Sequence, residues 1–198
     1  MSSVSHRTPA LPYRTSAELV SRLEHLRSAP ADEGTVHLVV RRPDLGEREI
    51  LEEGLLDTAD GRHFDAQVNV MSARMVALLA DTDEEQAYAG DQLYLDLDLS
   101  HANLPTGSRL AFGEPGAGGA VIEVSAKPHN GCAKFVAVAG DDAARFVNSE
   151  TGKHLRLRGF NARVVEAGVV RPGDVVRVVR RGGLDDQTDS SARGAVSV

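Results

Sequence analysis

The only cysteine of this 198-residue chain, Cys132, has a histidine three residues before it and a lysine two residues after it. Cationic neighbours favour the thiolate, which is the form of cysteine that attacks electrophiles and binds metals. Gly131 places no side chain next to the sulfur. We therefore predict that Cys132 is a nucleophile or a soft metal ligand, and that His129 is a second catalytic residue. Two alternatives stay open, because a free cysteine is commonly a small buried hydrophobic residue, and a histidine in a turn commonly satisfies backbone groups.

The most basic part of the chain surrounds and follows this cysteine. Residues 127–163 contain seven lysines and arginines against three acidic residues, a local charge of +4, which leaves −11 for the rest of a chain of net charge −7. The alternation in residues 153–158 predicts a strand with Arg156 and Arg158 on one face, about 7 Å apart. Guanidinium groups at that spacing suit a phosphate or a carboxylate. The alternative is an arginine-bearing outer barrel face in contact with solvent.

Short hydrophobic segments separated by turn residues recur along the whole chain. They predict strands at 35–40, 47–56, 66–71, 92–99, 108–112, 120–126, 153–158, 162–166 and 175–181. They also predict helices at 16–28, 73–80 and 141–147, of which the first begins with a capping box. Many short strands with few helices are typical of a closed or nearly closed β-barrel, so the fold class is mainly β. We expect an arm and a short helix at 1–34, the barrel at 35–181, and a disordered tail at 182–198.

The segment 92–99 has the strictest alternation in the chain. It predicts a half-buried strand with leucines on the core face and with Tyr94, Asp96 and Asp98 on the solvent face. Two carboxylates on one face could bind a hard cation. Without a ligand loop beside them, they are more typical of a solvated face.

Composition excludes several classes of function. The negative net charge and the 4 % aromatic content argue against a nucleic-acid partner, which needs cations and stacking side chains. No apolar run reaches the roughly 18 residues of a membrane span, and residues 1–10 do not resemble a secretory signal. A single cysteine is typical of a reducing compartment, so we expect a cytoplasmic protein without membrane contact. The glycines at 113–119 stand between two predicted strands, which excludes a dinucleotide-binding turn.

The order and spacing of several motifs resemble the MOSC domain, the C-terminal domain of molybdenum cofactor sulfurase, in its small stand-alone bacterial form. The motifs are HNGCAKF at 129–135, FVNS at 146–149, LRLRGFNARVV at 155–165 and GVVRPGD at 168–174. Earlier motifs are GDQL at 90–93, LDLS at 97–100 and LPTGSRL at 104–110. The resemblance covers about residues 35–180. It departs from the family at 54–65, where the usual His-Gly-Gly loop is not present.

The resemblance implies a β-barrel with one functional cysteine. In some relatives this cysteine binds the molybdenum of the pyranopterin cofactor, and in others it is proposed to carry sulfur as a persulfide. Cys132 is then a metal ligand in a reductase of N-hydroxylated compounds, or a sulfur carrier; a non-catalytic barrel is the third hypothesis. The reductase needs an external electron donor, and the carrier needs a sulfur donor protein. Pyridoxal phosphate is associated with the family only through a fusion partner, so we do not expect these residues to bind it. The residues expected to hold the anionic cofactor are Lys134, Arg156, Arg158, Asn161 and Arg163.

Overall fold

The computed structural model describes residues 11–44, 46–58, 67–114 and 118–183. Residues 1–10 of the predicted arm, Ala66 of the third predicted strand and residues 184–198 of the predicted tail therefore lie outside the described residues. The strands are β1 (Glu33–Arg41), β2 (Glu49–Ile50), β3 (Gly54–Leu56), β4 (Val68–Ser72), β5 (Leu93–Asp96), β6 (Arg109–Phe112), β7 (Val121–Val124), β8 (Phe160–Glu166), β9 (Gly168–Val170) and β10 (Val175–Arg180). The helices are α1 (Ser16–Ser21), α2 (Leu23–Arg27), α3 (Ala73–Leu79), α4 (Asp83–Ala87), α5 (Ala133–Asn148) and α6 (Glu150–His154).

Seven strands form a closed barrel in the order β10-β6-β7-β8-β4-β5-β1, and β1 pairs with β10 to complete it. β4 and β5 are parallel, and the other neighbours in the barrel are antiparallel. β2 pairs antiparallel with the end of β1, while β3 and β9 form a separate two-stranded sheet. The predicted fold class, a mainly β barrel with short helices, is confirmed.

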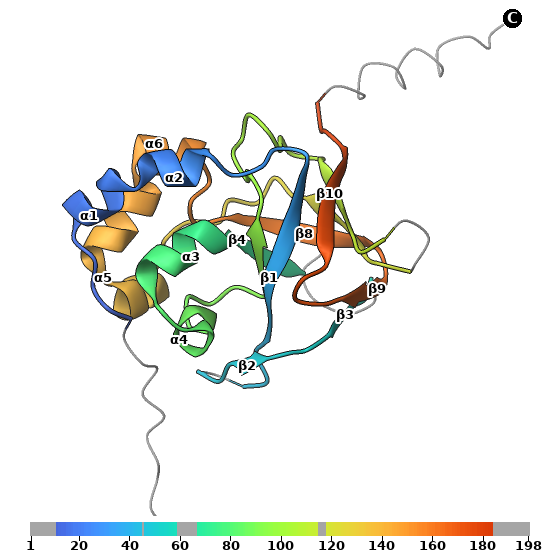
Figure 1. The fold of residues 1–198 in the computed structure, drawn as a ribbon, viewed down its shortest axis with the longest axis horizontal. Helices are drawn as coiled ribbons and strands as arrows, with labels where there is room; N and C mark the ends of the chain where they lie inside the picture. The colour runs from blue at the N-terminus through green and yellow to red at the C-terminus, as the bar shows by residue number, and fades with distance from the viewer. Residues whose placement is uncertain (1–10, 45, 59–66, 115–117, 184–198) are drawn as a thin grey trace, which may run out of the picture.

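The helices gather on one side of the barrel (Figure 1). As a result, the strands beneath them are buried on both faces. Leu93 and Leu95 of β5 belong to the core inside the barrel, whereas Tyr94 belongs to a second core between the barrel and the helices. Tyr94 is fully buried, so its predicted position on a solvent face is wrong. Strand alternation identifies the two faces, but it does not show which elements cover them.

The predicted strand at 153–158 is also wrong. Residues 150–154 form α6, which begins where the side chain of Ser149 accepts a hydrogen bond from the backbone of Gly152. Four turn residues follow, and one of them, Arg156, has a positive φ of 47°. Alternation therefore does not place Arg156 and Arg158 on one face. The signal that competes with the alternating leucines is the helix-capping serine.

Three smaller differences concern a strand, a helix and the start of the described chain. The expected returning strand at 47–56 is divided into β2 and β3, and β3 pairs with β9, which the sequence analysis did not predict. α5 is divided by the non-helical Gly140: the segment after it agrees with the predicted helix at 141–147, and the segment from Ala133 to Gly140 was not predicted. Residues 11–14 are not a loose arm, because Leu11 is buried and its backbone donates to Val138.

Gly159 fixes the entry of the chain into β8. Its φ is +88°, and a side chain there would approach the carbonyl oxygen of Val70 to 1.7 Å. Only glycine allows this backbone contact between the turn and β4. The turn that contains Arg156 and Arg158 is therefore held tightly against the barrel. Within the described residues, no helix has the length and apolarity that crossing a membrane requires.

Candidate functional site

Cys132 is the residue at which α5 begins. The chain leaves β7, passes through residues 125–131, which we call the cysteine loop, and enters the helix at Cys132. The side chain of Asn148, at the other end of α5, accepts from the backbone of Gly131 at 3.0 Å and donates to its carbonyl at 2.9 Å, which fixes the loop. Cys132 is exposed, so the alternative of a buried packing cysteine is wrong.

The surroundings of Cys132 favour the thiolate. The backbone N–H of Phe135 lowers the pKa of Cys132 most, and partial burial opposes it. The N–H of Lys134 and the charge of Arg158 lower the pKa further, and the net direction is downward. A cysteine with a lowered pKa and an exposed sulfur has the properties of a nucleophile or a metal ligand.

We expect alkylation of Cys132 by iodoacetamide to show this shift directly. The thiolate is the reacting form, so the rate rises with pH and levels off above the pKa. In the folded protein the midpoint should lie below the ordinary cysteine value of about 8.5. The same chain unfolded in urea is the control, and no other cysteine contributes to the signal. Equal midpoints in the two samples would contradict the effect of the helix and of Arg158.

Beneath the cysteine loop lies a buried ionic network centred on Asp91. This carboxylate is fully buried, with Oδ1 accepting from His129 Nε2 at 2.7 Å and Oδ2 accepting from Arg158 Nη1. Burial alone would raise the pKa of Asp91, but the charge of Arg158 and the contact with His129 outweigh it and hold the pKa below its usual value. The guanidinium of Arg158 also stacks over the ring of Phe135, with 4.8 Å to its centroid. The network therefore ties the cysteine loop, α5 and the turn before β8 together.

Arg156 is a buried cation of a different kind. It is 7 % exposed and donates to His101 Nε2 at 3.3 Å and to the carbonyl of Leu104. No carboxylate pairs with it among the described residues. Burial lowers the pKa of Arg156 to about 10, so the group is still charged at neutral pH. Burial lowers the pKa of His101 as well, and the charges of Arg156 and His154 add to that effect.

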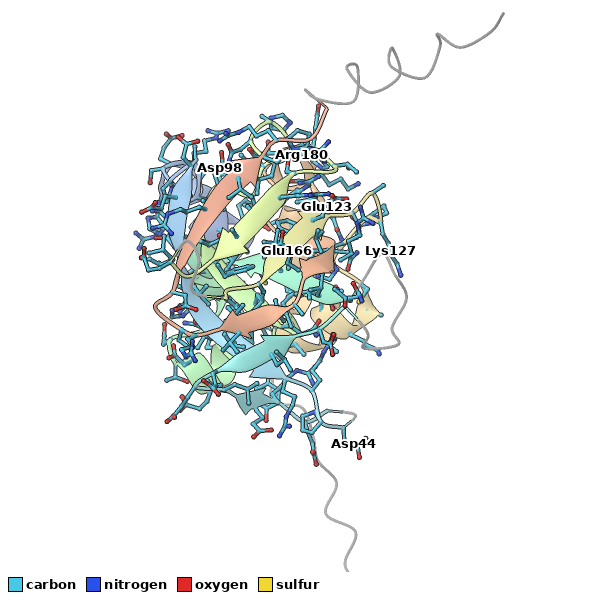
Figure 2. All side chains as sticks on the ribbon, turned by 90° about the vertical axis from the view of Figure 1, so that its right-hand side faces the viewer. Asp44, Asp98, Glu123, Lys127, Glu166 and Arg180 are labelled. Atoms are coloured by element: carbon cyan, nitrogen blue, oxygen red, sulfur yellow. The ribbon has the colours of Figure 1, made fainter. Side chains whose placement is uncertain are left out.

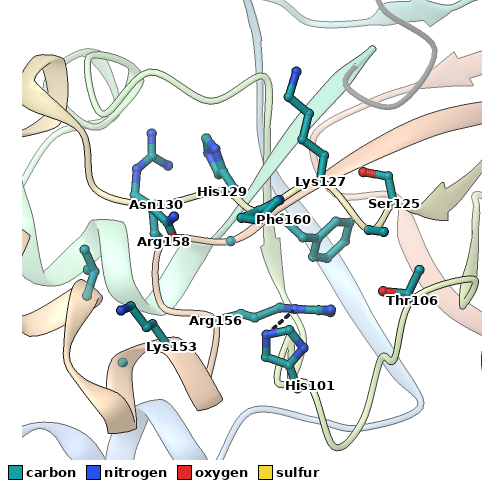
Figure 3. Close-up of a pocket in the computed structure, with 15 residues that line it drawn as sticks. His101, Thr106, Ser125, Lys127, His129, Asn130, Lys153, Arg156, Arg158 and Phe160 are labelled. Atoms are coloured by element: carbon teal, nitrogen blue, oxygen red, sulfur yellow. Dashed lines mark hydrogen bonds between the residues drawn. The ribbon is translucent and has the colours of Figure 1, made fainter.

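These groups border a pocket of about 210 Å³ next to the cysteine loop (Figure 3). Its cationic lining residues are Lys127, Lys153, Arg156 and Arg158, and none of its described lining residues is acidic. His129 and Asn130, from the cysteine loop, also line it. The dashed line in Figure 3 marks the contact between Arg156 and His101. Such a pocket has the charge and size to bind a phosphate or another small anion.

The structure does not bring all the predicted site residues into this pocket. Arg156, Arg158 and His129 line it, whereas Cys132 and Lys134 are exposed at the start of α5 and lie outside its lining. Asn161 is buried and donates to the carbonyls of Lys127 and Pro128, which supports the loop from behind.

Arg163 faces another part of the barrel. It pairs with Glu123, which projects from β7 (Figure 2). Glu123 also pairs with Arg109 of β6, so these three side chains form a separate ionic cluster across neighbouring strands.

Sequence reasoning missed three residues of the site. Asp91 has no motif that marks it as a partner of His129, which is 38 residues later. His101 and Lys127 reach the pocket only through the fold. The only sequence signal for Lys127 was its place at the start of the basic segment 127–163. Within the described residues, no group of three or more histidine, cysteine, aspartate or glutamate side chains could hold a metal ion by itself.

Comparison with solved structures places this arrangement among known folds. YiiM from Geobacillus stearothermophilus, a MOSC-domain protein, is similar with a TM-score of 0.54 and 19 % identity over 75 % of each chain. The chain has a MOSC-like fold. A structure described as a hypothetical protein is similar with a TM-score of 0.51 and 21 % identity, over 76 % of this chain and 68 % of the other. No protein-family model and no curated protein sequence matched the chain. Because both sequence identities are below 25 %, this similarity shows a shared fold and not a shared function.

Proposed function

We propose that this protein binds the pyranopterin molybdenum cofactor, with the thiolate of Cys132 as metal ligand, and that it reduces N-hydroxylated compounds. The observation that carries the proposal is the buried Arg156. It remains charged, it has no carboxylate partner among the described residues, and it lines a pocket that is also lined by His129 and Asn130 of the loop leading to Cys132. Cys132 itself is exposed and has a lowered pKa. A buried cation without a counter-ion is costly, and an anionic ligand would supply that counter-ion.

The residues present fit the cofactor in two respects. The phosphate of the pyranopterin would lie in the pocket, with Arg156, Lys127 and Lys153 as its cations. A single soft thiolate from the protein suits a metal whose other ligands, the dithiolene sulfurs, come with the cofactor, so a cluster of three protein ligands is not needed. When bound, the cofactor would supply two-electron redox chemistry. The chain itself would bind the phosphate, present the thiolate and orient the substrate, and a separate protein would supply electrons.

Metal analysis tests this proposal. The protein is produced in a host that makes the cofactor and in a host that cannot make it, and molybdenum is measured per chain. We expect a ratio close to one in the first host and background in the second. Background in both hosts would contradict the proposal, and so would another metal at full occupancy in both.

A specific observation also favours a second function, that of a sulfur carrier. The thiol of Cys132 is exposed and its pKa is lowered, which suits attack on a sulfur donor as well as metal binding. In that case Cys132 would carry one additional sulfur atom and no molybdenum. Mass spectrometry of the intact protein distinguishes the two states.

A further inference from the structure

The contact with Asp91 determines which ring nitrogen of His129 carries a hydrogen. Asp91 is fully buried, and its two oxygens are taken by His129 and Arg158. Because the pKa of Asp91 is held below its usual value, the carboxylate is ionised at neutral pH and can only accept hydrogen bonds. Nε2 of His129 must therefore carry the hydrogen that lies between the two groups. The ring is fixed in one tautomer and in one orientation.

The other ring nitrogen is the one left for a ligand. His129 lines the pocket, its side chain is 16 % exposed, and no described residue forms a hydrogen bond with Nδ1. A neutral ring offers a lone pair at Nδ1, and a protonated ring offers a hydrogen there. An imidazole held on one side by a buried carboxylate, with the opposite nitrogen available, is the arrangement in which histidine exchanges protons with a substrate. The same loop leads into Cys132, three residues later.

We propose that His129 is the proton donor of this site, acting through Nδ1 on the hydroxyl oxygen of an N-hydroxylated substrate, and that Asp91 is the residue that positions it. This inference rests on the proposed function. Cleavage of an N–OH bond takes up two electrons and two protons and releases an amine and water. The external electron-donor protein supplies both electrons. His129 supplies one proton to the departing oxygen, and solvent supplies the second proton and then reprotonates the ring.

Arg158 allows Asp91 to stay ionised and so to position His129. Its guanidinium balances the charge of Asp91, so the carboxylate can be both buried and ionised beside an imidazole. Its Nε is buried and has no hydrogen-bond partner among the described residues, so Arg158 is held chiefly by Asp91, by the carbonyl of Ala89 and by Phe135. Arg158 is thus a structural partner of the positioning residue.

The first test needs neither cofactor nor turnover. Histidine labelled with ¹⁵N in the purified protein reports the tautomer of each ring by NMR, and His129 is assigned by its loss in His129→Gln. We expect His129 to carry its hydrogen on Nε2 at mildly alkaline pH, and we expect Asp91→Asn to weaken that preference. If Asp91→Asn does not fold, the double variant Asp91→Asn/Arg158→Met removes both buried charges and serves instead. A ring with its hydrogen on Nδ1 in the unmodified protein would overturn the proposal.

The second test uses the molybdenum-loaded protein, reduced methyl viologen as electron donor, and N-phenylhydroxylamine as substrate. We expect His129→Ala to lower kcat by about 100-fold or more, with molybdenum content and KM unchanged, and added imidazole to restore part of the rate. His129→Gln can still donate to Asp91 but cannot exchange a proton, so it should be equally slow and should not respond to imidazole. Activity within threefold of the original in either variant, or a loss that appears only in KM, would overturn the role of His129. Protein without molybdenum would refute the proposed function and the proton transfer with it, while the tautomer would still show whether Asp91 positions the ring.

Discussion

Cys132→Ser is expected to lose its molybdenum and its reductase activity while the fold is unchanged. A serine hydroxyl does not ionise at neutral pH, and its oxygen is a hard ligand where the metal takes a soft one. Replacing even an indirect supporting residue of a metal site weakens binding by about 10- to 100-fold, so loss of the ligand itself should exceed about 100-fold. Because the side chain is exposed, the free energy of unfolding should change by less than about 0.5 kcal/mol. Metal analysis and chemical denaturation of the same preparation measure both quantities.

Lys134→Met is the matched control for this variant. It removes a charge two residues from the sulfur, but Lys134 is exposed and lies outside the pocket lining. It should retain its molybdenum. If Cys132→Ser retains molybdenum as well, the metal is held by other groups and the proposed ligand is wrong. If the unmodified protein carries an extra sulfur atom on Cys132 and no molybdenum, the sulfur-carrier function is supported instead.

The architecture of the barrel could be predicted because its strands have strong local signals. β1, β8 and β10 coincide closely with β-branched segments, and turn residues such as Pro172 and Gly173 separate them. The burial of Tyr94 could not be predicted, since it depends on helices that cover the outer face of β5. The turn at 155–158 could not be predicted from local sequence either, and a strand was predicted in its place. Arg156 adopts a backbone conformation that few residues other than glycine adopt, and that conformation is set by tertiary packing.

The candidate site was predictable in its chemistry and not in its geometry. Cys132 stands out as a unique thiol among cations, which is a property of the sequence. Arg156 and Arg158 were selected by charge, and they do line one pocket, but through a turn rather than along a strand. Asp91 was not selected at all. A carboxylate acquires a special role by being buried against a distant histidine and arginine, and burial of that kind is a property of the folded chain.

Asp91→Ala should destabilise the protein more than any other substitution considered for this site. It leaves the guanidinium of Arg158, which is 6 % exposed, buried without its counter-ion. Breaking a buried pair by removing one partner costs about 3–5 kcal/mol, a large part of the 5–15 kcal/mol that stabilises a typical domain. Chemical denaturation measures the loss. Asp81→Ala is the control, because that carboxylate pairs with Arg14 at an exposed position and its removal should cost less than about 1 kcal/mol.

The double variant Asp91→Ala/Arg158→Met separates the cost of an orphaned charge from the value of the pair. Removing both charges should recover most of the lost stability, since an apolar replacement of a buried pair is often close to neutral. The pair also sets a pH dependence. The pKa of Asp91 is lowered in the folded state, so its contribution is complete above the unfolded value of about 3.9 and is lost as the pH falls towards the folded value. The double variant should therefore lose less stability than the unmodified protein between neutral pH and about pH 3. Equal losses in the two proteins would mean that Asp91 does not depend on Arg158 and His129 for its charge, and the positioned imidazole next to Cys132 would lose its physical basis.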